Sequence, residues 1–397
     1  MPTPSPAVVA ANRMTARWAG RHREGPTVQS GVGVWVLLAA LEGGATGTGL
    51  DQLEAAVGLP AADALAAVRE VIEVLGSSPA LHAALGLWFR DSVPVEAAWL
   101  DQLPPRSLGR LTGDLDADQA TLDAWADAET QGEIDRFPIH VDDSTMSVLA
   151  SALSVRTEWS EPFVDVPSEL PGGPWAGMAL IQLHRTTTDL DDLRVADDGL
   201  GQLTMARVEG DGDVDVWLLL GGPDAPPEAV LDDGLAALAS LDDTVLGSEL
   251  PDGRPGPGLE VSTVTSTRDA PQLVLSTVAF EVDAEHDLLE QADVFGLRAA
   301  TDDSVGHFPG ISSFPLAIQQ ARQTALARFH ATGFEAAAVT AMAQRAGSAM
   351  PTTSYEVRRV ALHIDRPFAF AAVHRPSGLI LATGWVTEPA QPADEPI

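Results

Sequence analysis

The chain of 397 residues contains no cysteine and, as the printed sequence shows, no lysine. The absence of thiols excludes disulfide bonds, thiolate catalysis and metal sites with cysteine ligands. Every basic side chain other than histidine is therefore an arginine, and 23 of them stand against 57 acidic residues, for a formal net charge of −34. This charge argues against a nucleic-acid partner.

A long apolar run is also missing. The longest one, residues 32–41, is about half the length of a membrane span, and the N-terminus lacks a charged start followed by an apolar stretch. We therefore expect a cytoplasmic protein with no membrane partner, with secretion by another route as the open alternative. Since 45% of the residues are hydrophobic, a large core is expected and wholesale disorder is excluded.

Signatures of enzymes and cofactors are scarce. The nine histidines form no HxxxH or HExxH pair, so no metal site is expected, and no GxSxG turn marks a hydrolase. Gly31 and Gly33 form a GxG without a third glycine or a preceding strand, which indicates close packing of a buried helix instead of a dinucleotide site. No cofactor and no catalytic residue are predicted.

Three aspartates alternate in a pattern like the opening of a calcium loop: Asp211, Asp213 and Asp215. The position that needs a turn glycine is Val216, however, and the twelfth position is Gly222 where the motif needs glutamate. The segment is therefore expected to be a hairpin turn.

The spacing of apolar residues predicts helices in the first third of the chain and strands later. The expected helices lie near residues 50–57, 65–75 and 121–134, and the expected strands are 81–89, 146–155, 214–220, 273–284 and the hairpin 368–375 with 379–386. This order favours an α+β fold with antiparallel sheets in one interleaved domain, residues 1–397.

One segment departs from ordinary composition. Residues 333–340 read GFEAAAVT, and residues 341–355 continue with mostly small and polar side chains. Two interpretations stay open from the pattern alone, an exposed helical linker or a mobile loop whose first part can enter a sheet.

At this point two motifs resemble one known family. GFEAAAVTA at 333–341 is similar to the hinge of the serpins, the serine protease inhibitors, and residues 365–389 resemble their C-terminal signature. Weaker similarities occur at Trp125, Thr130, Gly132 and Ile134, and in the segments 151–163 and 307–312. The resemblance runs from about residue 8 to 389, and we expect a prokaryotic-type member.

The resemblance implies a fold of three β-sheets and about nine helices with an exposed reactive-centre loop at about 333–355. In that family a target serine protease cuts the loop and forms an acyl-enzyme, and the freed hinge inserts as a new central strand. The implied partner is a serine, or alternatively a cysteine, protease, and the implied protein is a metastable monomer. The alternative function is that of a non-inhibitory serpin-fold binding or carrier protein.

The resemblance also assigns residues to the hinge. They are Gly333, Phe334, Glu335, Ala336, Ala337, Ala338, Val339 and Thr340. Strand alternation predicts that Phe334, Ala336, Ala338 and Thr340 point inward on insertion and that Glu335 stays in solvent. Phe334 stands where the family usually has Thr or Ser, and a ring without space would cost about 1–3 kcal/mol.

Counting from the hinge by the family's spacing places the reactive bond at Gly347-Ser348, with Arg345-Ala346 as the alternative. Gly347 would suit a subtilisin- or elastase-like protease, and Arg345 a trypsin-like one. Trp159 corresponds to the family's breach region, where the loop begins to enter the sheet.

The shutter beneath the central sheet is expected to contain Ser30, Ser151 and Gln323, with Gly33 at a position where relatives have a second serine. A polar network through Ser151 and Gln323 is expected there.

Overall fold

The computed structural model describes residues 4–104, 107–170, 172–197, 202–334 and 354–392. Helices and β-sheets both contribute to the core, so the predicted α+β class is confirmed. This part of the chain contains eight α-helices: α1 (Pro6–Ala19), α2 (Gly31–Glu42), α3 (Gly47–Val57), α4 (Ala61–Gly76), α5 (Ala97–Leu100), α6 (Leu115–Glu129), α7 (Pro227–Ala239) and α8 (Ala292–Phe295).

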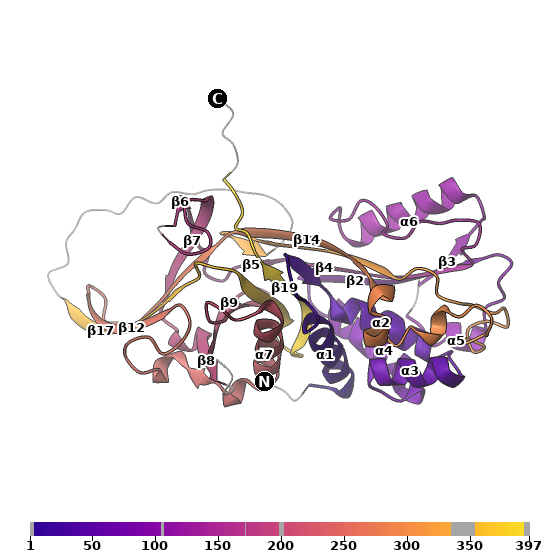
Figure 1. Ribbon diagram of the computed structural model, residues 1–397, viewed down its shortest axis with the longest axis horizontal. Coiled ribbons are helices and arrows are strands. Elements are labelled where there is room, and N and C mark those ends of the chain that lie inside the picture. The colour runs from indigo at the N-terminus through magenta and orange to yellow at the C-terminus, as the bar shows by residue number, and fades with distance from the viewer. Residues whose placement is uncertain (1–3, 105–106, 171, 198–201, 335–353, 393–397) are drawn as a thin grey trace, which may run out of the picture.

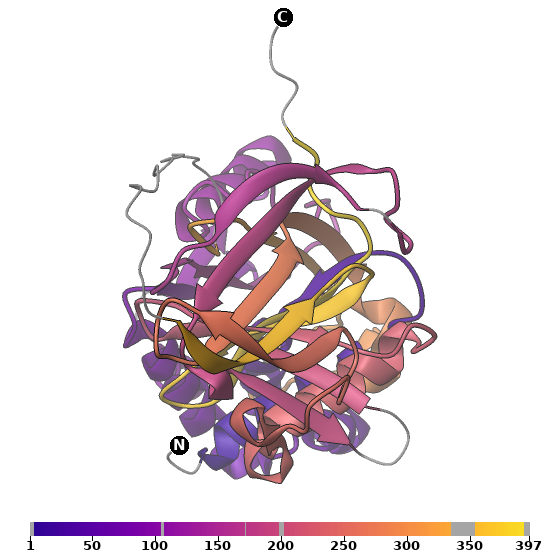
Figure 2. The same ribbon diagram turned by 90° about the vertical axis from the view of Figure 1, so that its left-hand side faces the viewer.

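Two sheets form one half of the molecule. The seven-stranded sheet has the order β1 (Thr27–Gln29), β19 (Leu379–Val386), β18 (Phe368–His374), β10 (Val214–Leu220), β9 (Gln202–Glu209), β8 (Leu193–Asp197) and β11 (Val245–Leu246). The five-stranded sheet has the order β12 (Leu259–Ser266), β17 (Tyr355–His363), β13 (Gln272–Val278), β7 (Ala179–Thr187) and β6 (Val164–Glu169). Figure 2 looks onto the end of the molecule that carries the second of these sheets.

The other two sheets lie side by side under α6 (Figure 1). One consists of β14 (Phe280–Asp287), β15 (Arg322–Phe329), β16 (Gly333–Phe334) and β5 (Thr157–Glu158); the other consists of β3 (Leu108–Leu111), β2 (Leu81–Arg90) and β4 (Ser147–Val155). The described chain thus has four sheets where three were expected, because β4 and β15 do not pair with each other and the central sheet is divided.

Two predicted elements have different bounds from those expected. The helix expected at 121–134 is α6, which ends earlier because Gln131 and Gly132 adopt left-handed backbone conformations, with φ of 58° and 88°. The strand expected at 273–284 is two strands in different sheets, β13 and β14, separated by Ala279. The C-terminal hairpin was predicted correctly and forms β18 and β19.

Helix α2 runs through the core, and all of its residues except Leu37 are buried. A side chain at Gly31 would collide with Thr15 of α1, so the glycine allows the two helices to approach closely. Close packing thus explains the GxG pattern, as expected, but the expectation that no strand precedes it was wrong, since β1 ends just before the helix. Asp211 and Asp213 lie in the turn between β9 and β10 and Asp215 lies in β10, and no cluster of metal-binding side chains occurs among the described residues. None of the helices described is long and apolar enough to cross a membrane.

One carboxyl group lies in the core. Glu42, the last residue of α2, is 1% exposed, and neither of its carboxyl oxygens has a hydrogen-bond partner among the described residues. Burial, with a smaller contribution from the charge of Glu54, raises the pKa of Glu42 to about 8. The folded protein therefore holds this carboxyl in its neutral form over most of the ordinary pH range.

Glu42 predicts a specific pH dependence of stability. An unfolded chain releases this proton near pH 4.5, whereas the folded chain keeps it up to about pH 8. Stability should therefore be greatest below that window and fall by about 1.4 kcal/mol per pH unit as the pH rises through it. Glu42→Gln should remove this slope, so urea denaturation of both proteins from about pH 5 to 9 should show the variant gaining relative to the parent. Parallel profiles would contradict the assignment.

Candidate functional site

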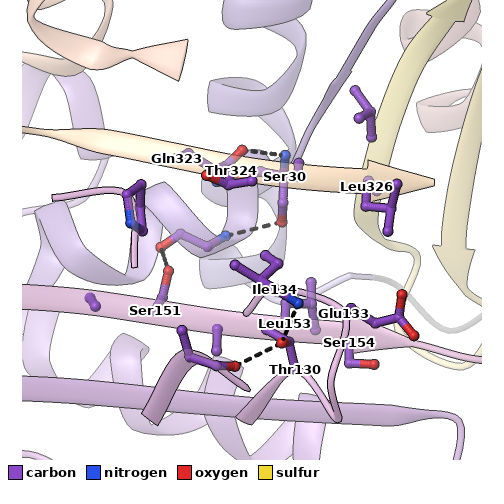
Figure 3. Close-up of a pocket in the computed structure, with 18 of the residues that line it drawn as sticks. Ser30, Thr130, Glu133, Ile134, Ser151, Leu153, Ser154, Gln323, Thr324 and Leu326 are labelled. Carbon is purple, nitrogen blue, oxygen red and sulfur yellow. Dashed lines mark hydrogen bonds between the residues drawn. The ribbon is translucent and has the colours of Figure 1, made fainter. Parts of the chain in front are cut away.

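A slot separates β4 from β15 in the divided central sheet. Each strand pairs on its outer side only, β4 with β2 and β15 with β14. The exception is Phe329 of β15, which pairs with Phe334 at one end of the slot. We call this end, next to Phe334, the upper end of the slot. A cavity of about 140 Å³ lies between the two strands, and Figure 3 shows it with Ser151 and Leu153 on one side and Gln323 and Leu326 on the other. The facing edges of β4 and β15 have no strand between them over most of their length in the described chain.

The side chains along the slot show the effect of this gap. Leu149, Leu153 and Val155 alternate with buried residues along β4 and face the main core, yet they are only partly buried. Ala325 of β15 is also partly buried and lies on the core side. Apolar side chains that a neighbouring strand would cover are therefore left partly exposed.

The hinge begins at the upper end of this slot. Phe334 pairs with Phe329 of β15 on one side and with Thr157 of β5 on the other, and it is 3% exposed. Its ring centroid lies 6.1 Å from that of Phe370. The ring therefore has space in the sheet, and the expected packing cost at this position does not arise in this arrangement.

Trp159 lies beside the hinge. Its backbone N–H donates to the carbonyl of Thr332 at 2.9 Å, and its indole Nε1 donates to the carbonyl of His330 at 2.8 Å. The ring is buried and packs on Phe329, with 4.8 Å between centroids. These contacts connect the end of the β4–β5 segment to the turn between β15 and β16.

A charged network supports Trp159 from behind. Trp159 forms a β-bridge with Gly210, and the guanidinium of Arg375 donates to the Gly210 carbonyl at 2.7 Å and to buried Asp215 at 2.7 Å. The hydrogen bonds that the Arg375 guanidinium donates to Asp215 raise the pKa of Arg375 above its usual value. The third aspartate of the alternating run thus anchors the strand next to Trp159 and is no calcium ligand candidate.

The polar residues expected in the shutter meet at the start of α2. Ser30 and Gln323 form two hydrogen bonds, from Ser30 N to Oε1 and from Nε2 to Ser30 O, both of 2.9 Å. The Ser30 hydroxyl donates to the carbonyl of Leu381 at 2.7 Å, and the Ser151 hydroxyl donates to the carbonyl of Gly33 at 2.8 Å (Figure 3). Ser151 and Gln323 are therefore connected through the backbone of α2, which lies directly below the slot.

A second cavity, of about 240 Å³, adjoins the lower end of the slot. It shares Val34, Leu37 and Leu149 with the first cavity and extends to Met146 and Phe314. Together the two cavities follow β4 and β15 from Phe334 to the first residues of both strands.

The opposite face of the slot carries a charged bridge that the sequence did not suggest. Glu133, in the segment after α6, accepts hydrogen bonds from Arg156 at 2.8 Å and from Arg328 at 2.9 Å. Arg156 follows β4 and Arg328 belongs to β15, so one carboxylate joins the two sides. The only feature of the sequence that pointed to this bridge was the position of Arg156. It lies three residues before Trp159, in the segment that resembles the family's central strand.

The remaining predicted site residues lie outside the described part of the chain. They are Glu335, Ala336, Ala337, Ala338, Val339 and Thr340 of the hinge and the reactive-bond candidates Arg345, Ala346, Gly347 and Ser348. Of the predicted site, the structure therefore places Gly333, Phe334, Trp159 and the three shutter residues around one slot.

Comparison with known proteins gives the same assignment at the level of family. The model of the family described as "Serpin (serine protease inhibitor)" matches residues 10–167 and 263–389. No curated protein matches the chain at the sequence level.

Solved structures share the fold at low sequence identity. A serpin from the trematode Schistosoma haematobium is 13% identical, with a TM-score of 0.72 over 97% of this chain and 100% of that chain. The thermophilic serpin tengpin in its native state is 13% identical, with a TM-score of 0.75 over 96% of this chain and 94% of that chain. Human thyroxine-binding globulin in complex with its hormone is 16% identical, with a TM-score of 0.72 over 97% of this chain and 98% of that chain. Since the family model matches well over half of its length, the chain belongs to the serpin family.

Proposed function

We propose that this protein inhibits a serine protease as a suicide substrate. The protease cuts the loop that follows Phe334 and forms an acyl-enzyme through its own serine. The freed hinge then enters the slot between β4 and β15 as a new strand and carries the tethered protease along. The protein itself contributes no catalytic residue to this reaction.

The observation that carries the proposal is the slot with Phe334 at its upper end. Phe334 already pairs with strands on both sides, so the next residues need only continue an existing antiparallel register. Each further residue would pair backbone N–H and C=O groups on two open edges and cover partly exposed apolar side chains. The uncut protein has not realised this free energy, which fits a metastable starting state.

The loop sequence suits the slot when this register is continued. Ala336 would face Val155 and Ala327, Ala338 would face Leu153 and Ala325, and Thr340 would come between Ser151 and Gln323. The entering alanine side chains would thus be small at the positions where side chains of β4 and β15 already line the slot. A hydroxyl would arrive where the slot has polar groups, so it would find partners on both sides.

The number of residues needed to fill the slot agrees with the position of the candidate reactive bonds. Filling the slot from Arg156 down to Ser147 takes about ten residues, or roughly 34 Å of extended chain. These are residues 335–344; Arg345-Ala346 comes directly after them, and Gly347-Ser348 lies two residues further on. We prefer Gly347-Ser348, which suits a subtilisin- or elastase-like protease, over Arg345-Ala346, which suits a trypsin-like one. We further propose a monomeric, prokaryotic-type, cytoplasmic inhibitor.

A second candidate function is that of a non-inhibitory carrier. The fold is shared with human thyroxine-binding globulin, whose solved complex contains its hormone. A carrier has no need of a loop that fits the slot, so the behaviour of the cut loop separates the two candidates.

Cleavage of the loop should raise the melting temperature. When residues 341–353 are cut by a non-specific protease, insertion of the hinge should complete the central sheet and raise the apparent melting temperature by tens of degrees, because about ten strand residues become paired and buried. Thermal unfolding followed by circular dichroism before and after cleavage measures this. An unchanged melting temperature would exclude insertion and favour the carrier.

A substitution inside the slot should abolish this rise. Thr340→Arg would bring a charge between Ser151 and Gln323 without a carboxylate partner, so the cut variant should melt close to the uncut protein. Ala349→Arg is the matched control, because it makes a similar change beyond both candidate bonds and should keep the full rise. Equal rises in both variants would contradict the register.

The reactive bond can be read directly. Mixing the protein with subtilisin-, elastase- and trypsin-like proteases should give a complex that resists boiling in detergent, with release of a C-terminal peptide that begins at Ser348. Arg345→Ala should leave such a complex intact. Its loss in the variant, with a released peptide beginning at Ala346 in the parent, would move the reactive bond to Arg345-Ala346.

A further inference from the structure

The cavity at the lower end of the slot is larger than the one between β4 and β15. We call it the lower cavity; it is bounded by α2, by the start of β4 and by residues 314–322, which lead into β15. Its volume is about 240 Å³. An apolar cavity of about 150 Å³ holds one benzene molecule, so by simple scaling the lower cavity has room for roughly ten non-hydrogen atoms.

The floor of the lower cavity is apolar. Helix α2 contributes Val34, Leu37, Leu38 and Leu41 to it. Leu37 is the one residue of α2 that is not buried, and its side chain lines both cavities. Met146, just before β4, is also only partly buried and lines the lower cavity. An apolar group bound here would cover these side chains and would itself be removed from water.

The mouth of the lower cavity is polar. The Ser144 hydroxyl donates to Oε1 of Gln319 at 3.0 Å, and Nε2 of Gln320 donates to the carbonyl of His140 at 3.0 Å. Both hydrogen bonds lie at the surface, and both join the segment after α6 to the segment before β15. A ligand with an apolar body and a polar end would therefore find a matching environment at each end.

Arg322 supplies a positive charge beside this mouth. It is the first residue of β15, and it lines both cavities. The next residue, Gln323, bonds to Ser30 at the start of α2, and side chains alternate along a strand, so Arg322 lies on the face turned away from α2. Its one ion pair among the described residues is with Asp287, at 3.4 Å, which is longer than a hydrogen-bonded pair. The guanidinium has five N–H donors and thus retains donors for an anion.

The charges around the lower cavity are arranged with a polarity. Asp303 is the one acidic side chain that lines it among the described residues, and unlike Arg322 it does not line the first cavity. Asp303 follows Ala300, whose carbonyl accepts from the N–H of Ile318 at 2.8 Å, four residues before Arg322. The positive charge therefore lies on the side of the slot and the negative charge on the opposite side. A bound carboxylate is stabilised beside Arg322 and repelled beside Asp303, which determines its orientation.

We propose that the lower cavity is a binding site for a medium-chain carboxylate, whose carboxylate pairs with Arg322 and whose hydrocarbon chain packs on α2. A chain of about eight carbons with its two oxygens has the ten non-hydrogen atoms for which the cavity has room. The inference is independent of the proposed function, because only residues of α2, of β4 and of the segments next to β4 and β15 form this site.

Isothermal titration calorimetry with octanoate tests the assignment. In roughly 0.15 M salt, which screens the long-range repulsion from the acidic chain, octanoate should bind one site with a Kd below about 1 mM. Butyrate should bind at least about tenfold more weakly, because it covers less of the apolar floor. Arg322→Gln should weaken octanoate binding at least about tenfold and leave the binding of 1-octanol, which has no charge, unchanged.

The matched control is Arg110→Gln. Arg110 is an exposed arginine of β3 that pairs with Asp91 at 2.7 Å, away from both cavities, so its variant should bind octanoate as the parent does. If the parent shows no saturable binding of octanoate, the site is wrong. If Arg322→Gln weakens octanoate no more than 1-octanol, recognition of a carboxylate is wrong.

Filling the cavity provides a second test of the location. Leu37→Trp should abolish octanoate binding, because the larger side chain occupies the space on α2. Ala317→Phe makes the same change from the segment before β15, outside any helix or strand, and answers the question if Leu37→Trp does not fold. Circular dichroism of each variant checks folding. Binding that persists at the parent affinity in a folded filled variant would place octanoate elsewhere and overturn the proposal.

Discussion

The structure depends on one unfinished interaction, the missing pairing between β4 and β15. Both strands have partners on their outer sides, and their facing edges leave open backbone groups and partly exposed leucine and valine side chains along the slot. Water can satisfy the open backbone groups, but a strand in the gap would pair them and bury the apolar side chains as well. In the described part of the chain, the central sheet is therefore divided between β4 and β15.

The rest of the site consists of contacts that hold this gap in its present form. At the upper end, Trp159 and Phe334 join the two sides through backbone pairing and aromatic packing. Below the slot, Ser30 and Gln323 join β15 to α2, and Ser151 joins β4 to the same helix. These contacts are polar or aromatic, and they join segments that are far apart in the chain.

Although the whole chain is strongly acidic, oppositely charged side chains form ion pairs at the slot. The 57 acidic residues outnumber the 23 arginines by more than two to one. Two of these arginines nevertheless flank the slot on its α6 side and share Glu133. Among the many carboxylates of the chain, Glu133 is thus stabilised by arginines from both sides of the slot.

The sequence by itself determined the fold class, the C-terminal hairpin, the packing role of Gly31 and the family, because these depend on periodicity, on local sterics and on two distinctive motifs. It also indicated that Phe334 points inward, since strand alternation is a local property. Only the tertiary structure decided that the ring of Phe334 has space beside Phe370, that the central sheet is divided, and that Glu133 bridges Arg156 and Arg328. These features depend on the distance and register between segments far apart in the chain, and no spacing within a single segment encodes them.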